Sequence, residues 1–422
     1  MNFINFNFKQ RIFDKYIENI NEKYHAVIKV FGMKIKYRVR YIIDNEFALK
    51  KFIKSKKPRI LMCVFAFCPG GGETLPIFLS NELQSRNYPV LILNWRVQQE
   101  CDEIKSLIDS NIPIINLYDK DSLFEIVKKY NIDIIQSQHG AVDKFISVNR
   151  DKFPKNCKHI VVTHGYYECK DKKFSDKYIP KLISNVDRWL YTTDKNLGPF
   201  KSYVKDFTNF YRVYNALPNP DINPISISDL NIPKNSFTLC MIARGVPEKG
   251  WIEAIEAVKV AREKSNLDIH LIIIGNGLMY DTLVNNVPNF IHLLGVKSNI
   301  RDYISISDML IVPSKFKGES FPLVIIDALA CSKPVIASNI GEIKNMLTDA
   351  QGNIAGKIFN LNDFEIPVND LAEIIKDFAA IPEIYNNAKD VAQRMQNRYD
   401  IKKVVDMYIE HYNEISRNNN YV

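Results

Sequence analysis

Two cations stand five residues apart in the segment ARGVPEKGW, residues 243–251. Arg244 follows an apolar run that predicts a strand, and Lys249 precedes a sequence with the spacing of an amphipathic helix. Pro247 is a residue type that commonly begins a helix. Two cations above a helix N-terminus suit a pyrophosphate group, and the alternative is a pair of solvated charges on a loop.

Two carboxylates follow in the block GESFPLVIIDALACSKPVIAS, residues 318–338. Glu319 and Asp327 are eight residues apart in the chain, which is roughly 12 Å along a helix axis. Two carboxylates at that separation could bind hydroxyl groups on opposite sides of a diphosphate. Asp327 lies in a mostly apolar stretch, so it needs a partner or a ligand unless it faces solvent on a single polar stripe.

A glycine-rich turn, CPGGGE, follows the longest apolar run of the first half and precedes a helix expected to begin near Leu75. Gly70, Gly71 and Gly72 would let the backbone approach a ligand closely, and a helix N-terminus favours an anion. The turn has neither the G-K-[ST] of a P-loop nor the G-x-G-x-x-G of a dinucleotide-binding turn. An ordinary strand-to-helix connection is the alternative interpretation.

Two histidines, His139 in QSQHG and His164 in VVTHG, end predicted strands and precede glycines. A histidine at such a strand end can hydrogen-bond a substrate or move a proton, and a structural histidine is the alternative for each. We expect structural or surface positions for His159, His270, His292 and His411.

No sequence pattern predicts a metal site. The seven cysteines are scattered without a C-x-x-C pair, and no D-x-D-like acidic cluster is evident. Buried, reduced thiols in a cytosolic protein are the expected state.

Short apolar runs alternate with amphipathic stretches twice along the 422 residues, which is length enough for two domains. This βα repetition, with β-branched runs that lack clean alternation, predicts α/β domains with doubly wound parallel sheets. The expected strands are 59–67, 89–95, 112–118, 132–138, 159–165, 188–193 and 211–216, then 237–243, 268–275, 290–295, 309–314 and 333–338. Helices are expected at 75–86, 122–130, 251–265, 371–381 and 401–415.

Two tandem Rossmann-like domains joined by a proline-rich linker are the simplest account of this order. Ligands of such sheets bind outside the carboxyl ends of the strands, which predicts a site in a cleft between the domains. The expected divisions are a basic N-terminal extension (1–57), a first domain (58–216), a linker (217–236), a second domain (237–395), and a C-terminal helix (396–422) that could pack back on the first domain.

The basic charge is confined to the N-terminus. Residues 1–57 carry a net charge of +9, whereas the whole chain carries +8, so the remaining residues sum to −1. This distribution argues against a nucleic-acid binder with a cationic main groove. No apolar run reaches the roughly 18 residues of a membrane span, and the first residues lack the zones of a signal peptide.

The N-terminal extension has two parts. Apolar residues between Phe13 and Phe31 follow helical spacing, and residues 33–41 then alternate basic with apolar side chains. Lysines and arginines beside aromatic residues suit an anionic membrane surface, at about 1 kcal/mol per cation near the lipid. A solvated cap packed on the first domain is an equal alternative.

Taken in order, these motifs resemble those of the retaining GT-B glycosyltransferases called glycosyl transferases group 1. The resemblance covers about residues 59–415, closely in the second half and loosely in the first. It rests on the glycine-rich turn, the R-x(4)-K-G of Arg244, Lys249 and Gly250, and four further segments: IIIGNG (272–277), HLLG (292–295), ESFPLVIIDALACSKPVIAS (319–338) and residues 341–359.

The resemblance implies a nucleotide-sugar donor (a UDP- or GDP-sugar) bound mainly by the second domain, an acceptor bound by the first, and no cofactor or metal. Arg244 and Lys249 would bind the diphosphate, and Glu319 the hydroxyls of the transferred sugar. Asp327 replaces the glutamate that usually holds the ribose and is one methylene shorter. The implied catalytic residues are His164, Arg244, Lys249 and Glu319; the implied donor-binding residues are Gly70, Gly71, Gly72, Arg244, Lys249, Gly275, Glu319, Ser320, Phe321, Pro322, Leu323 and Asp327.

The expected function is therefore retaining sugar transfer to a glycan or lipid-linked acceptor, in the synthesis of a surface polysaccharide (capsule or lipopolysaccharide) or a glycolipid. The expected location is cytoplasmic, peripheral at the inner face of the cytoplasmic membrane if residues 1–57 bind lipid. The alternatives are a nucleotide-sugar epimerase on the same fold and a non-catalytic GT-B partner subunit.

Overall fold

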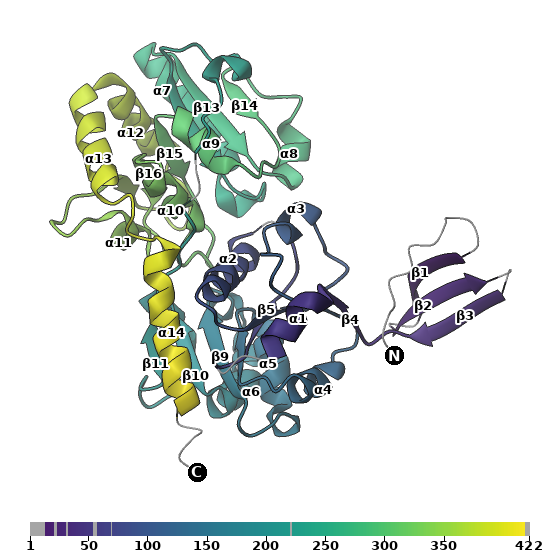
Figure 1. The fold of residues 1–422 in the computed structure, drawn as a ribbon. Coiled ribbons are helices and arrows are strands. Elements are labelled where there is room, and N and C mark those ends of the chain that lie inside the picture. Colours follow the sequence, from purple (N-terminus) through teal and green to yellow (C-terminus); the bar gives the residue numbers. More distant parts are fainter. Residues whose placement is uncertain are drawn as a thin grey trace. The chain divides into compact units, whose positions relative to one another are not determined.

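The computed structural model describes residues 13–20, 23–30, 33–53, 57–68, 70–219 and 222–417. The strands form three sheets, and helices connect most strands of the two larger ones (Figure 1). By their internal contacts the residues divide into two compact units. The first contains 1–137, 145–159 and 413–422, and the second contains 138–144 and 160–412.

The largest sheet has eight strands in the order β11-β10-β9-β8-β5-β6-β7-β4. Parallel pairs join β5 to β6 and β8, β6 to β7, and β10 to β9 and β11, whereas β4 runs antiparallel to β7. The strands are β4 (Tyr41–Asp44), β5 (Ile60–Val64), β6 (Val90–Asn94), β7 (Ile114–Leu117), β8 (Ile134–Ser137), β9 (Lys158–Thr163), β10 (Arg188–Tyr191) and β11 (Phe210–Arg212). The helices along this part of the chain are α1 (Glu46–Ile53), α2 (Gly71–Ser85), α3 (Asp102–Lys105), α4 (Ser122–Lys129), α5 (Gly140–Val148) and α6 (Lys172–Asn185).

The second large sheet is parallel throughout, in the order β14-β13-β12-β15-β16-β17. Its strands are β12 (Phe237–Ile242), β13 (Ile269–Ile274), β14 (Ile291–Leu293), β15 (Met309–Val312), β16 (Val335–Ser338) and β17 (Gly356–Phe359). The helices that follow the linker are α7 (Trp251–Ser265), α8 (Leu278–Leu283), α9 (Ile300–Ile306), α10 (Leu323–Ala330), α11 (Ile343–Leu347), α12 (Val368–Ala380), α13 (Pro382–Arg394) and α14 (Ile401–Arg417).

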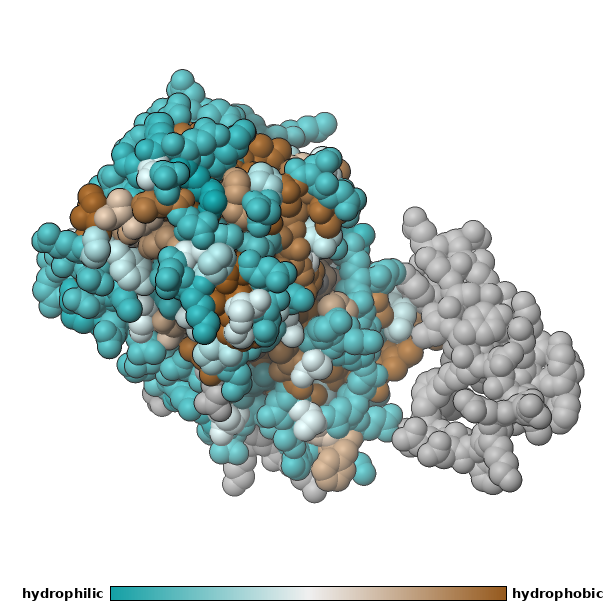
Figure 2. Space-filling view, turned by 90° about the horizontal axis from the view of Figure 1, so that it is seen from above, coloured by the Kyte–Doolittle hydropathy of each residue, from teal (hydrophilic) through white to brown (hydrophobic). Residues whose placement is uncertain are grey.

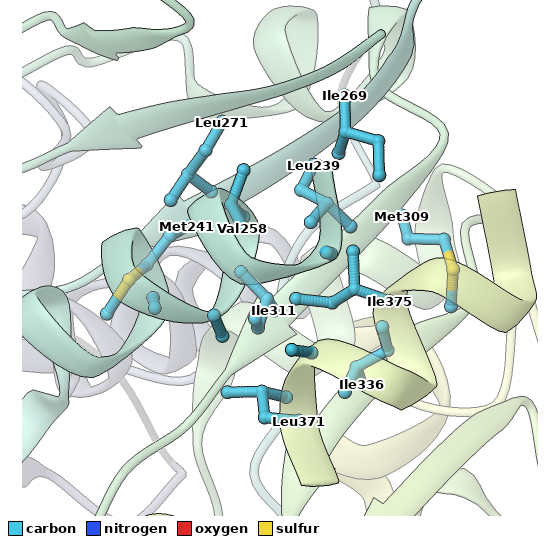
Figure 3. Close-up of a cluster of buried hydrophobic side chains, with 14 of the residues drawn as sticks. Leu239, Met241, Val258, Ile269, Leu271, Met309, Ile311, Ile336, Leu371 and Ile375 are labelled. Carbon is cyan, nitrogen blue, oxygen red and sulfur yellow. The ribbon is translucent and has the colours of Figure 1, made fainter. Parts of the chain in front are cut away.

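A hydrophobic core covers one face of the second sheet, between its strands and the helices α7 and α12. Leu271 of β13 and Ile311 of β15 pack with Val258 of α7 and Leu371 of α12 (Figure 3). Full burial of each large apolar side chain stabilises the fold by roughly 1.5–3 kcal/mol, because its surface is removed from water. Ile252, which would widen the apolar stripe of α7, is instead 52% exposed. Hydrophobic residues also show among hydrophilic ones on the face seen in Figure 2.

The twelve predicted strands are all present, and the predicted α/β class with two parallel-dominated sheets is confirmed. Helix α7 has the predicted bounds, but α2 begins four residues earlier than expected. Gly70 precedes its first turn and Gly71 opens it, because the carbonyl oxygen of Gly70 already accepts the N–H of Thr74 at 3.0 Å. The cysteines are free thiols, but only Cys63, Cys157 and Cys240 are buried as expected; Cys68, Cys101 and Cys331 are partly buried, and Cys169 is exposed.

The helix predicted from Phe13 onward is wrong. Residues Phe13–Ile20 and Lys23–Val30 are strands β1 and β2, which form an antiparallel sheet with β3 (Met33–Arg38). Phe31 lies outside the described residues. The apolar residues of Lys23–Val30 also recur at every second position, and that period matches the strand.

Residues 38–53 pack within the first unit. Arg38 forms an ion pair with Asp119 at 2.8 Å, and Arg40 one with Glu125 at 2.7 Å. Strand β4 continues the sheet beside β7, and α1 buries Phe52. This stretch therefore behaves as the packed cap, one of the two alternatives for the N-terminal extension. In the described part of the chain, no helix combines the length and apolar character needed to cross a bilayer.

Candidate active site

Lys249 and Glu319 meet at one edge of the second large sheet. Lys249 ends a short 3-10 turn, Pro247–Lys249, between β12 and α7, and Glu319 lies in the loop between β15 and α10. Because β12 and β15 are parallel neighbours, the loops that leave their carboxyl ends emerge side by side. Lys249 Nζ lies 2.5 Å from Glu319 Oε2. The structure thus brings together two of the four predicted catalytic residues.

A serine that the sequence motifs did not single out completes this contact. Ser314 follows β15, is 1% exposed, and donates its hydroxyl to Glu319 Oε2 at 3.0 Å. Lys249 Nζ also lies 5.1 Å from the centre of the Phe316 ring. A buried carboxylate needs such partners, because an uncompensated charge costs several kcal/mol. The two donors hold the carboxylate of Glu319 in a defined orientation.

Two other implied residues lie at the ends of neighbouring strands without joining the pair. Arg244 follows β12 and is exposed, and the ion pairs recorded among the described residues do not include it. Gly275 follows β13, and its N–H donates to the carbonyl oxygen of Gly295 at 2.9 Å. An exposed arginine beside this edge keeps its guanidinium available for an anionic ligand.

The residues after Glu319 lead into α10. Ser320 has its hydroxyl 2.9 Å from Asn196 Nδ2, and Phe321 is 4% exposed with its ring against Tyr399. Pro322 caps α10 and Leu323 begins it. The side chain of Phe321 therefore packs in the interior. Only the backbone of this residue remains available for the predicted contact with the donor.

Asp327 has a protein partner that sequence reasoning missed. Arg301 of α9 donates from Nε to Asp327 Oδ1 at 2.7 Å, and both side chains are under 10% exposed. Burial raises the pKa of Asp327 to about 6, and the guanidinium of Arg301 opposes that shift. Asp327 therefore satisfies its need for a partner inside the fold. Its contact with a ribose stays a prediction.

The two strand-end histidines are held differently. His164 Nε2 lies 3.2 Å from Gln138 Oε1, and burial lowers the pKa of His164 to about 4. His164 is therefore neutral at pH 7. It can donate or accept a hydrogen bond, but it does not carry the extra proton that a general acid would give up. His139 Nδ1 accepts the N–H of Ala141 at the start of α5, which fits the structural alternative.

The remaining histidines occupy structural positions, as expected. His159 pairs with Ser137 at 2.8 Å, His270 with His292 at 2.9 Å, and His411 with Arg188 at 2.9 Å.

The glycine turn belongs to the first unit. Gly71 and Gly72 form the first turn of α2. A methyl group on Gly70 would lie 2.4 Å from Glu73 Oε2, so the carboxylate of the first helical turn sits close to this N-terminus. An acidic side chain is favourable at that position. Binding of donor phosphates by Gly70, Gly71 and Gly72 stays a prediction.

Among the described residues, no group of three or more His, Cys, Asp or Glu side chains is arranged to hold a metal ion.

Burial of neutral histidines predicts a loss of stability in acid. Burial lowers the pKa of His159 to about 3 and that of His164 to about 4, from about 6.5 in the unfolded chain. Below pH 6.5 the unfolded state binds more protons, so the free energy of unfolding should fall as the pH drops from 6.5 toward 4. Urea unfolding at pH 7 and pH 5 measures this. His159→Gln should lose less stability over that interval, and equal losses in variant and wild type would contradict the assignment.

The chain is similar to known glycosyltransferases. Residues 223–395 match the model of the family described as glycosyl transferases group 1. An Escherichia coli UDP-Gal:alpha-D-GlcNAc-diphosphoundecaprenol alpha-1,3-galactosyltransferase is 29% identical over 68% of this chain and 78% of its own. A Campylobacter jejuni N,N'-diacetylbacillosaminyl-diphospho-undecaprenol alpha-1,3-N-acetylgalactosaminyltransferase is 24% identical over 58% of this chain and 62% of its own.

The fold has solved counterparts. Anabaena Alr3699/HepE, in complex with UDP and glucose, superposes with a TM-score of 0.67 at 16% identity, over 84% of this chain and 99% of that one. At that identity the likeness concerns the fold. Residues 223–395 thus match the glycosyl transferases group 1 family, and the two parallel-dominated, Rossmann-like sheets give the chain the GT-B fold.

Proposed function

We propose that this glycosyltransferase moves a sugar from a uridine-diphosphate donor to a sugar carried on a lipid diphosphate, with retention of anomeric configuration. The observation that carries the proposal is the Lys249–Glu319 contact, where one cation and one oriented carboxylate share the carboxyl edge of β12 and β15. The names of the two relatives, with alpha linkages and diphosphoundecaprenol acceptors, support the acceptor class and the retention.

The proposed site uses charge and position rather than a protein nucleophile. The bond between the anomeric carbon and the donor phosphate breaks, and its electron pair goes to the departing diphosphate. The acceptor oxygen bonds to the same face of that carbon, and its proton passes to the departing phosphate oxygen. Arg244 and Lys249 would stabilise the charge that develops on the diphosphate, which is the usual role of preorganised cations in such transfers.

Glu319 would hold hydroxyl groups of the donor sugar. Lys249 and Ser314 donate to one of its oxygens, Oε2, and so keep the carboxylate oriented. Lys249 carries three N–H donors, so it can keep its bond to Glu319 while it binds a phosphate oxygen. His164, neutral at pH 7, would exchange hydrogen bonds with the sugar. Such positioning can supply much of the barrier reduction without acid catalysis.

The charge of Lys249 is expected to matter for turnover. Lys249→Ala should lower kcat by roughly 10²–10³, the usual cost of removing one preorganised group that stabilises developing charge. Steady-state kinetics measures this, with the thermal midpoint as a check on folding. The matched control is Lys259→Ala on α7, which removes an exposed lysine that pairs with the exposed Glu256. Unchanged kcat in Lys249→Ala would refute the role.

Donor and acceptor are tested together. A thermal-shift panel of nucleoside diphosphates and nucleotide sugars should single out a UDP-sugar, since a ligand stabilises the folded chain in proportion to ln(1 + [L]/Kd). The selected donor is then incubated with a synthetic polyprenyl-diphosphate sugar, and the anomeric configuration of the product is read by NMR. We expect an alpha product from an alpha donor.

The other outcomes identify the alternatives. Epimerised or released sugar without acceptor would point to a nucleotide-sugar epimerase, and failure to bind any donor would point to a non-catalytic partner subunit. We expect transfer to persist in EDTA, and strict dependence on a divalent cation would refute metal independence.

We also propose that the N-terminal sheet contacts an anionic membrane surface at the cytoplasmic face, where a lipid-linked acceptor would be found. The support is the charge of residues 1–37, where seven lysines and arginines stand against three acidic residues, and the position of Lys34 and Lys36 on β3. Arg38 and Arg40 do not count toward this surface, because they form the ion pairs with Asp119 and Glu125.

The test is a chain that begins at Arg38, which keeps those ion pairs and β4. It should lose co-sedimentation with vesicles that contain anionic lipid, while its thermal midpoint stays unchanged. Neutral vesicles and the variant Lys34→Gln/Lys36→Gln serve as controls for charge. Equal sedimentation of the full and shortened chains would refute the membrane contact.

A further inference from the structure

Two residues outside the sequence motifs hold the loop that carries Glu319. Lys195 and Asn196 lie in a 3-10 segment, Asp194–Phe200, directly after β10. Lys195 Nζ donates to the carbonyl oxygens of Lys317 and, at 3.2 Å, Glu319. Asn196 Nδ2 lies 2.9 Å from the hydroxyl oxygen of Ser320. Both residues and the loop belong to the second unit.

The side chain of Asn196 is fixed in one orientation. Its Oδ1 accepts the backbone N–H groups of Thr192 at 3.2 Å and Thr193 at 3.1 Å, and the residue is 1% exposed. Because backbone N–H groups can only donate, the oxygen must face them and the NH₂ group must face the loop. The amide therefore presents two N–H donors in fixed directions.

A second acceptor, Glu168, lies at the other donor of Asn196. Glu168 Oε1 accepts from Nδ2 at 2.6 Å, which makes Asn196 a bridge between Glu168 and Ser320. Burial raises the pKa of Glu168. Its Oε2 is buried and has no hydrogen-bond partner among the described residues.

The loop also rests directly on the backbone that follows His164. Gly165 has φ +89°, and a Cβ there would lie 2.0 Å from the carbonyl oxygen of Gly318, so only glycine permits this approach. On its other side the loop is bound by Glu342, whose N–H donates to the carbonyl oxygen of Ser320 at 2.7 Å. The loop is thus held from both sides, and Asn196 supplies its side-chain contact at Ser320.

We propose that Asn196, held by Thr192 and Thr193 and backed by Glu168, is a positioning residue that sets Glu319 for the sugar part of the donor. The inference rests on the proposed role of Glu319 in donor binding. Asn196 acts on Glu319 through the neighbouring Ser320, while Lys249 contacts Glu319 directly. Loss of the Asn196 contact should therefore affect recognition of the sugar and leave binding of the nucleotide alone unchanged.

The test variant is Asn196→Asp, which keeps an oxygen for Thr192 and Thr193 but replaces both donors with an acceptor. Two carboxylates, those of residues 196 and 168, then face and repel each other, and the Ser320 hydroxyl must turn round to donate. A displacement of about 1 Å in a positioned group can cost 10²-fold in rate, and we expect a fall in kcat of that order. Calorimetry with UDP should give the wild-type affinity within about twofold, whereas the extra affinity of the UDP-sugar over UDP should disappear. Asn286→Asp, an exposed site on the connection after α8, controls for the added charge.

A polarity exchange separates positioning from simple loss of stability. In Asn196→Asp/Glu168→Gln, the new amide of residue 168 can donate to the new carboxylate, which restores the bridge with reversed direction. We expect this double variant to recover at least tenfold of the lost kcat. No recovery, together with equal losses in UDP and UDP-sugar affinity, would show that Asn196 has only a structural role.

A measurement without substrate tests the effect of Asn196 on the loop separately from the proposed function. Hydrogen exchange of residues 315–322 in the ligand-free chain should be faster in Asn196→Asp than in wild type, and faster than in Asn286→Asp. Unchanged exchange would overturn the positioning role even if the enzyme is active. Conversely, a wild-type chain that transfers no sugar would refute the proposed function, while exchange would still show whether Asn196 holds the loop.

Discussion

The site depends on one electrostatic constraint: a carboxylate almost removed from water must keep a cation beside it. Glu319 meets this constraint through Lys249, with a hydroxyl from Ser314 on the same oxygen. Because the partners leave adjacent parallel strands, the hydrogen-bonded register of β12 and β15 sets how far apart they can be. The sheet therefore sets the position of two charges, which is the kind of preorganisation that stabilises a departing anion.

The same constraint explains the second buried pair. Arg301 and Asp327 join α9 to α10, and Arg301 also reaches Asn219 at 3.4 Å in the segment before β12. Removing one partner of such a pair leaves a charge that the interior cannot solvate. The pair thus ties the helix that follows the Glu319 loop to two other elements. Asp327 therefore has a structural role as the partner of Arg301. A glutamate, which is one methylene longer, would have to pair with Arg301 in a different geometry.

Sequence patterns predicted the large sheets well because a parallel strand buried on both faces leaves an uninterrupted apolar run. The family resemblance implied that Lys249 and Glu319 belong to one donor site, and their meeting fits the way strand ends in such sheets converge at one edge. Neither the patterns nor the resemblance predicted Arg301 or Asn196, whose partners lie 26 and 124 residues away and depend on tertiary packing. The N-terminal helix was mispredicted because short runs of mixed apolar residues fit both the 3.6-residue and the two-residue period.

Strand β4 has a consequence for the chain's behaviour in solution. It lies antiparallel along β7 at the edge of the eight-stranded sheet. Residues 41–44, which look in the sequence like part of a removable extension, therefore pair with backbone N–H and C=O groups of β7 that would otherwise be exposed. Uncovered edges of this kind are templates for intermolecular pairing and aggregation. Shortening the protein past Tyr41 would therefore threaten its solubility more than its catalytic groups, and proteolysis in the first 57 residues would be harmless only before that strand.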